Sequence, residues 1–221
     1  MREQKIKLLM KEFVTHDVIR YIFEKPSDLE FVSGQATELS MEGKEWRPFT
    51  FVSRPDDLVL EFIIKTYPEH DGVTRKFSDL IPGDSVNIKD VFGTMLYEGE
   101  GIFIAAGAGI TPFIPILRKL NEGSQLGGNK LFFSNKEKKD IILEKEFREM
   151  FTSEDLIFVL TRGEGEGYLQ GRMNEDFIRE HVRDFNQKFY ICGPKIFVKQ
   201  IRDILERNGA KTKSLIFEGK K

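Results

Sequence analysis

Residues 103–113 read FIAAGAGITPF, and the rest of the chain is organised on either side of this stretch. A short apolar run ends in two glycines and continues through Thr111 and Pro112 into residues 113–120, where apolar side chains recur at helical spacing. This order predicts a strand, a tight turn and a helix. A helix start offers unpaired N–H groups, and glycines let a pyrophosphate approach them closely. The turn therefore has the form of a dinucleotide site, although such turns also serve packing alone, and Pro112 stands where the usual fingerprint has Gly or Ala.

Length and composition are those of a globular protein. The 221 residues suffice for two domains of about 100 residues each. The 34 basic and 36 acidic residues give a formal charge of -2, which supplies no sequence-wide basic surface, so we expect no nucleic-acid partner. The first residues are far short of a signal-peptide core, and no apolar run reaches membrane-spanning length. We therefore expect a cytoplasmic protein with no membrane span.

Cysteine and histidine are too few and too scattered for a metal site. Cys192 is the only cysteine, which excludes an intramolecular disulfide and any four-cysteine metal or iron–sulfur site within these residues. His16, His70 and His181 lie in unrelated segments without metal-ligand spacing. We expect surface or turn histidines and no metal.

The first half of the chain, from residue 5 to about residue 88, is typical of short strands separated by turns. Residues 6–10 and 18–23 have the β-branched and aromatic content of strands, and the only helical turn is expected at 74–80. Several short strands at this spacing predict an antiparallel barrel.

The segment RPFTFVS, which begins at Arg47, places a cation, aromatic rings and a hydroxyl on one predicted strand. Alternation along a strand would put Arg47, Phe49 and Phe51 on one face and Pro48 and Thr50 on the other. Such a group can hold a phosphate and pack against a flat ring. A surface arginine on an amphipathic strand explains the same residues.

A second candidate contact begins at Gly72, where a loop leads into the predicted helical turn. Free N–H groups at that turn would suit a phosphate. An ordinary helix start accounts for it equally well.

After residue 101 the pattern changes to alternating strands and helices. The expected strands are 102–106, 131–134, 156–161, 189–192 and 214–217. The expected helices are 111–121, 143–151, 175–182 and 195–208, with Asn174 as an N-cap. This alternation predicts a parallel sheet covered by helices, a Rossmann-like domain. We place the domains at 1–97 and 98–221.

A second glycine turn follows the predicted strand 189–192. Cys192, Gly193 and Pro194 repeat the order of strand, glycine turn and helix start, and both turns fall at carboxyl ends of parallel strands, where open sheets bind ligands. Cys192 would then face the cleft, whereas a lone cysteine at a strand end is otherwise a small buried hydrophobe.

Four motifs in this order and spacing resemble the ferredoxin–NADP reductase family of flavoprotein oxidoreductases. They are residues 47–50, 72–74, 107–112 and 192–194. The resemblance covers nearly the whole chain. It implies a flavin-binding antiparallel barrel followed by an NAD(P)H-binding domain.

The resemblance assigns flavin contacts in the first half. Arg47 would pair with the flavin phosphates, Phe49 would pack against the flavin next to Pro48, and the Thr50 hydroxyl would lie near the reactive nitrogen N5. Phe49 departs from the commoner tyrosine. The flavin pyrophosphate would be held by three consecutive residues: Gly72, Val73 and Thr74.

The resemblance also assigns nucleotide contacts in the second half. The pyridine-dinucleotide turn would consist of Gly107, Gly109, Thr111 and Pro112. Cys192 would lie beside the nicotinamide C4, followed by Gly193 and Pro194. At the C-terminus Phe217 would cover the nicotinamide side and Glu218 would act near the flavin, although three further residues follow and no terminal tyrosine is present. Together with Thr50 and Cys192, Glu218 completes the expected catalytic set.

The implied activity is hydride transfer from NADPH or NADH to FAD, with FMN a less favoured cofactor, and onward delivery of electrons to a flavodoxin or ferredoxin. Arg162 could place a cation on a 2′-phosphate and slightly favours NADPH, against the acidic residues Glu164 and Glu166 that follow it. The alternatives are a free-flavin reductase and an electron-transfer subunit of an oxygenase complex.

Overall fold

The computed structural model describes residues 3–67, 69, 72–93 and 95–217. By their internal contacts, the residues form two compact units. The first contains Met1–Leu96 and Thr111–Lys119, and the second contains Tyr97–Ile110 and Leu120–Lys221.

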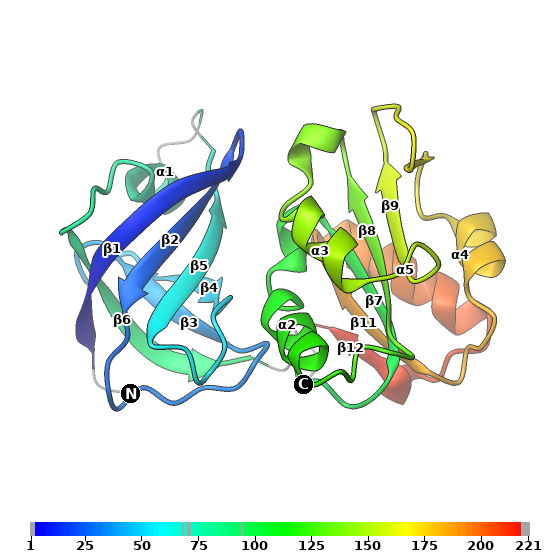
Figure 1. Cartoon of the computed structure of the whole chain (residues 1–221), viewed down its shortest axis with the longest axis horizontal. Coiled ribbons are helices and arrows are strands. Elements are labelled where there is room, and N and C mark those ends of the chain that lie inside the picture. Colours follow the sequence, from blue (N-terminus) through cyan, green and yellow to red (C-terminus); the bar gives the residue numbers. More distant parts are fainter. Residues whose placement is uncertain (1–2, 68, 70–71, 94, 218–221) are drawn as a thin grey trace. The chain divides into compact units, whose positions relative to one another are not determined.

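The first unit is an antiparallel sheet of six strands in the order β4-β3-β6-β1-β2-β5 (Figure 1). The strands are β1 (Gln4–Thr15), β2 (Val18–Glu24), β3 (Ala36–Ser40), β4 (Arg47–Thr50), β5 (Val59–Lys65) and β6 (Ser85–Phe92). Helix α1 (Val73–Phe77) lies between β5 and β6 in the sequence. Just after β4, the Val52 N–H donates to the Glu61 carbonyl of β5 at 2.8 Å, so the two edges of the sheet meet. The predicted antiparallel fold of this half is confirmed.

Aromatic rings fill the interior of this unit. Tyr21, Phe23, Phe51, Phe62 and Phe77 are all fully buried. Phe62 contacts Phe51 and Phe23 with ring centroids 5.4 and 6.0 Å apart. Large buried rings contribute much of the apolar area that stabilises a small barrel.

The second unit is a parallel sheet of six strands in the order β10-β9-β8-β7-β11-β12. The strands are β7 (Gly101–Ala106), β8 (Lys130–Asn135), β9 (Leu156–Leu160), β10 (Leu169–Gln170), β11 (Lys188–Cys192) and β12 (Leu215–Phe217). The helices that follow them within this unit are α3 (Glu144–Met150), α4 (Glu175–His181) and α5 (Lys195–Arg207). Three short 3-10 helices are η1 (Gly107–Ile110), η2 (Lys138–Asp140) and η3 (Thr212–Ser214). The predicted parallel sheet is confirmed.

Two predicted elements end or begin elsewhere. The helix expected from residue 111 is α2 (Ile114–Glu122), because residues 107–110 first form the 3-10 turn η1. At the start of α2, the Leu117 N–H donates to the Phe113 carbonyl. Pro115 lies in the first turn of α2, where a missing N–H is tolerated. The strand expected over 47–53 is β4 as far as Thr50; the Phe51 N–H still donates to the Gln35 carbonyl at 3.0 Å, and the next N–H, that of Val52, donates to Glu61 of β5 instead.

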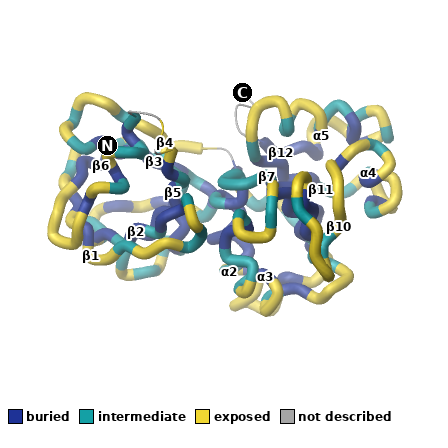
Figure 2. Tube along the Cα trace, turned by 90° about the horizontal axis from the view of Figure 1, so that it is seen from above, coloured by how far each residue is buried: buried dark blue, intermediate teal, exposed yellow. Residues whose placement is uncertain are grey.

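Burial follows the strands within each unit (Figure 2). The first five residues of β7 are buried without interruption, as expected for a strand covered on both faces, whereas β2 alternates toward its end. Every helix among the described residues is too short or too polar to cross a bilayer.

Candidate functional site

Strand β4 carries the expected flavin-binding side chains at an edge of the barrel sheet. Arg47 and Pro48 are exposed, whereas Phe49 and Thr50 are half-buried. The edge position suits Pro48, which has no N–H to donate to a further strand. Phe51, just after β4, is fully buried in the core, and the half-buried Phe49 packs against the same core cluster.

The structure brings β4 next to helix α1. The Phe49 ring contacts the Phe77 ring at 5.4 Å between centroids, which places the 72–74 segment on the same side of the barrel as β4. Gly72 precedes α1 without a side-chain cap, and the first turn holds no acidic residue. Val73 is buried and Thr74 is half-buried. Two segments that lie more than 20 residues apart in the sequence thus form one neighbourhood.

Positive charge marks this neighbourhood. The exposed Arg47 guanidinium donates to the Trp46 carbonyl at 3.0 Å. The hydrogen bond from Lys76 to Glu45, at 2.9 Å, holds the pKa of that carboxyl below its usual value, and the charge of Arg47 adds to the effect. Cations, a hydroxyl and an aromatic face are the donor set that a flavin with its phosphates requires, so these residues fit the group.

The dinucleotide turn in the second unit depends on close backbone contact. Gly107 has φ +53°, a conformation that favours glycine. A Cβ on Gly109 would lie 2.5 Å from the Cys192 carbonyl oxygen and 2.6 Å from the Gly193 Cα. The two glycine turns predicted from sequence therefore pack directly against each other, and Gly109 has no room for a side chain.

The second turn is set by the pairing of β11 with β7. Cys192 pairs with Ala105 and is buried, with 6% of its surface exposed. A Cβ on Gly193 would lie 3.1 Å from the Ala106 Cβ, and Pro194 is the N-cap of α5. The last two residues of the predicted dinucleotide turn, Thr111 and Pro112, belong to the first unit. Thr111 is half-buried and Pro112 is buried.

The remaining predicted contacts are more dispersed. Arg162 is exposed just beyond β9, and nearby Tyr168 donates its hydroxyl to Glu144 at 2.5 Å. Phe217 is 9% exposed and packs in the core of the second unit, under the Arg202 guanidinium at 4.1 Å. Glu218 lies outside the described residues.

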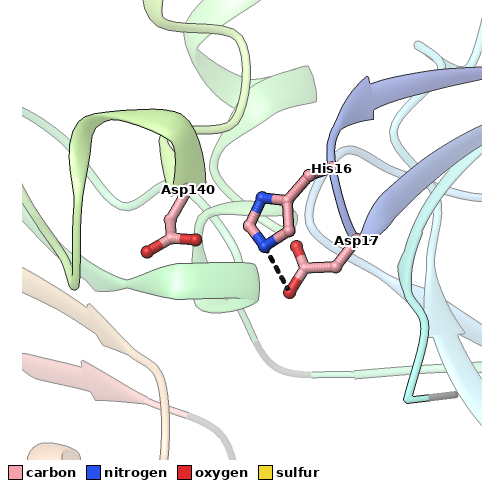
Figure 3. A group of neighbouring side chains, drawn as sticks. All are labelled: His16, Asp17 and Asp140. Carbon is pink, nitrogen blue, oxygen red and sulfur yellow. Dashed lines mark ion pairs between the residues drawn. The ribbon is translucent and has the colours of Figure 1, made fainter.

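The histidine positions are partly as expected. His16 occupies the turn between β1 and β2, where its Nε2 lies 3.6 Å from Asp17 Oδ2 (Figure 3). Burial would raise the pKa of Asp17, but the Lys65 ammonium lowers it below its usual value. Asp140, also drawn in Figure 3, belongs to the second unit and accepts a hydrogen bond from the Glu137 N–H at 2.9 Å.

His181 is half-buried at the last residue of α4. It is stacked on Phe177 with 4.4 Å between ring centroids. His70 lies outside the described residues.

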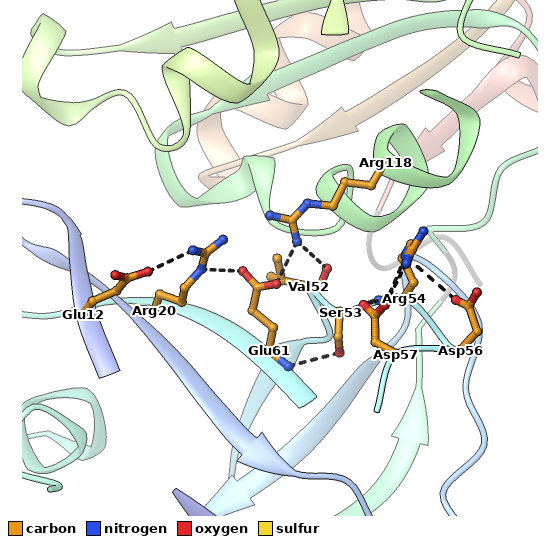
Figure 4. A network of polar contacts seen from close by, with 9 residues as sticks. All are labelled: Glu12, Arg20, Val52, Ser53, Arg54, Asp56, Asp57, Glu61 and Arg118. Atoms are coloured by element: carbon orange, nitrogen blue, oxygen red, sulfur yellow. Dashed lines mark hydrogen bonds and ion pairs between the residues drawn. The ribbon is translucent and has the colours of Figure 1, made fainter. Parts of the chain in front are cut away.

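Sequence reasoning missed an ion-pair network in the first unit (Figure 4). Glu61 is 8% exposed, and its two carboxylate oxygens accept from Arg20 Nε at 2.7 Å and Arg118 Nη1 at 2.8 Å. Arg118 also donates to the Val52 carbonyl at 3.3 Å, just beyond β4. The sequence did carry a signal for this network: Glu61 is the only acidic residue in the otherwise apolar run of β5, and a buried carboxylate needs a cationic partner.

Comparison with known proteins identifies both units. Residues 5–97 match the oxidoreductase FAD-binding domain, and residues 103–203 match the oxidoreductase NAD-binding domain. The chain belongs to the ferredoxin–NADP reductase family. It is an NAD(P)H-dependent flavin oxidoreductase that uses FAD.

Named relatives agree with this assignment. The chain is 27% identical to rat NADH-cytochrome b5 reductase 3 over 86% of its length and 77% of the relative. It is 25% identical to the ferredoxin--NAD(P)(+) reductase component of the naphthalene 1,2-dioxygenase/salicylate 5-hydroxylase systems of Ralstonia sp., covering 88% of this chain and 62% of the relative. A ferredoxin NADP+ reductase from Neisseria gonorrhoeae shares the fold, with a TM-score of 0.87 at 22% identity over 99% of this chain and 98% of that chain.

Proposed function

We propose that this reductase passes electrons from NAD(P)H, through FAD, to a separate small redox protein such as a flavodoxin or ferredoxin. The observation that supports the carrier is the single cysteine, since these residues offer no thiolate set for an iron–sulfur cluster of their own. When bound, the two cofactors supply hydride transfer between nicotinamide and flavin. The chain's own contribution would be to hold the phosphates and align the rings.

The names of two relatives support the same class of acceptor. One is named for cytochrome b5 and another for ferredoxin, each a separate redox protein. The second relative is a component of an oxygenase system, which favours an oxygenase component as the alternative partner.

The carrier is tested by anaerobic reduction with NADPH or NADH, followed by addition of oxidised flavodoxin, ferredoxin or cytochrome b5. We expect one carrier to be reduced at a rate that saturates with its concentration and falls as salt screens the encounter. Reduction of free flavin alone, together with loss of bound flavin on gel filtration, would instead identify a free-flavin reductase. A cytoplasmic setting is part of the proposal, and cell fractionation would test it.

A further inference from the structure

Two buried asparagines flank the same strand in the second unit and differ in their hydrogen bonding. Asn129 immediately precedes β8 and Asn135 ends it. Their exposed fractions are 1% and 5%. The matched residue type and burial make the pair an internal comparison.

Asn129, just before β8, has hydrogen-bond partners for both polar atoms of its side chain. Its Oδ1 accepts from the Gly101 N–H at 3.2 Å, and its Nδ2 donates to the Leu126 carbonyl at 3.2 Å. Its Nδ2 also lies 3.3 Å from the Tyr97 hydroxyl. This side chain ties the start of β8 to the start of β7.

Asn135, at the carboxyl end, leaves its carboxamide unused. Neither Oδ1 nor Nδ2 has a hydrogen-bond partner among the described residues, and both atoms are buried. Its main chain belongs to the sheet, where its carbonyl accepts from the Thr161 N–H at 2.9 Å. A buried unpaired amide lowers stability, so an unpaired one in a well-packed sheet points to a partner that arrives from outside the chain.

The position of Asn135 indicates what that partner is. Ala106 pairs with Ser134, so the parallel register places Asn135 one step further along, level with Gly107. Strand β8 contacts the turn η1. Asn135 shares a face of β8 with Phe133, which packs edge-on against Phe147 of α3 at 6.1 Å. It therefore lies at the ligand-binding edge of the sheet, beside the glycine turn.

We propose that Asn135 is a nucleotide-positioning residue whose carboxamide hydrogen-bonds the ribose–phosphate portion of the dinucleotide held at the Gly107–Ile110 turn. The amide N–H can donate to a phosphate oxygen, and the amide oxygen can accept from a ribose hydroxyl. A neutral group at this point orients the nucleotide without adding a charge that would favour NADPH over NADH. The role concerns the electron donor and is independent of the proposed carrier.

The test compares Asn135→Leu with the matched control Asn129→Leu in the full-length, FAD-loaded protein. Calorimetric titration with ADP-ribose measures nucleotide binding without turnover, and thermal unfolding without nucleotide measures stability. For Asn135→Leu we expect about tenfold weaker ADP-ribose binding with an unchanged or raised Tm, because an unpaired amide is replaced by an apolar group. For Asn129→Leu we expect a lower Tm and unchanged binding by the folded protein.

A conservative variant covers the case in which Asn135→Leu does not fold. Asn135→Asp keeps the shape but faces the phosphates with a carboxylate, so at pH 8 we expect binding at least as weak as that of the leucine variant. Unchanged ADP-ribose affinity in either variant, or a fall in Tm like that of Asn129→Leu without loss of affinity, overturns the proposal. Failure of the wild type to reduce a protein carrier would contradict only the proposed acceptor.

Discussion

The barrel and the parallel-sheet unit present their predicted ligand contacts by different means. In the barrel, β4 offers side chains, with Arg47 exposed and Phe49 half-buried. In the parallel sheet, the turn after β7 offers backbone, and Gly109 lies so close to Cys192 that no Cβ fits. A site made of side chains should depend on charge and contact, whereas a site made of backbone should depend on shape. The following variants test that contrast, from the largest expected effect to the smallest.

Gly109→Ala should have the largest effect, because its Cβ would overlap the Cys192 carbonyl at 2.5 Å and both partners are backbone. Overpacking of this kind costs about 3 kcal/mol. We expect ADP-ribose affinity to fall more than about 100-fold. In the control Gly127→Ala the added Cβ meets nothing within 4 Å, so binding should persist. Wild-type affinity in the Gly109 variant would contradict a backbone-built site.

Glu61→Ala should destabilise the barrel unit by removing the partner of two arginines. Its oxygens lie 2.7 Å from Arg20 Nε and 2.8 Å from Arg118 Nη1. Removing one side of a buried ion pair costs about 3 kcal/mol, which urea unfolding would show. The control Glu45→Ala removes an exposed pair with Lys76 and should change stability by less than about 1 kcal/mol. Equal effects of the two variants would show that the Glu61 network is dispensable.

Arg47→Ala should weaken FAD binding by about 30-fold, since a hydrogen bond to a charged group contributes about 2 kcal/mol. Quenching of FAD fluorescence measures the affinity. Arg54→Ala, which removes an ion pair with Asp57 in the same unit, serves as the control and should leave FAD affinity unchanged. Undiminished FAD binding by the Arg47 variant would remove its assigned role.

Cys192→Ala should slow flavin reduction by NADPH or NADH about tenfold while FAD stays bound. The family resemblance assigns Cys192 to the nicotinamide, and in the structure Cys192 ends β11 against the Gly109 turn; small misplacements of a reacting ring reduce rates strongly. Stopped-flow absorbance follows the reduction. The variant Cys192→Ser shows whether a side chain of similar size is enough to maintain the rate of flavin reduction. An unchanged rate in the alanine variant would rule out the catalytic role.

Arg162→Ala should have the smallest effect and act on one nucleotide only. The side chain is exposed beyond β9, where a cation would attract a 2′-phosphate. We expect about a fivefold lower kcat/KM for NADPH and no change for NADH, consistent with a surface ion pair of about 1 kcal/mol. The control Arg172→Ala should change neither value. Equal losses for both nucleotides would contradict a role in selecting NADPH.

The second unit was the more predictable from sequence. The helix expected over 195–208 is α5 at Lys195–Arg207, and Asn174 caps α4 by accepting from the Phe177 N–H at 2.9 Å. These elements form from local signals, which are apolar periodicity and capping residues. The barrel was less predictable, because β5 is buried almost throughout and shows no alternation that would mark it as a strand with one exposed face.

The sequence by itself determined the order of the strands and helices, the change of pattern after residue 101 and the four motifs that resemble the family. Each of these depends on residues close together in the chain. Only the tertiary structure decided that Gly109 abuts Cys192, that Glu61 joins Arg20 to Arg118, and that Asn135 is unpaired where Asn129 is not. Such contacts arise from strand pairing and packing between distant segments, and local propensity does not specify which segments meet.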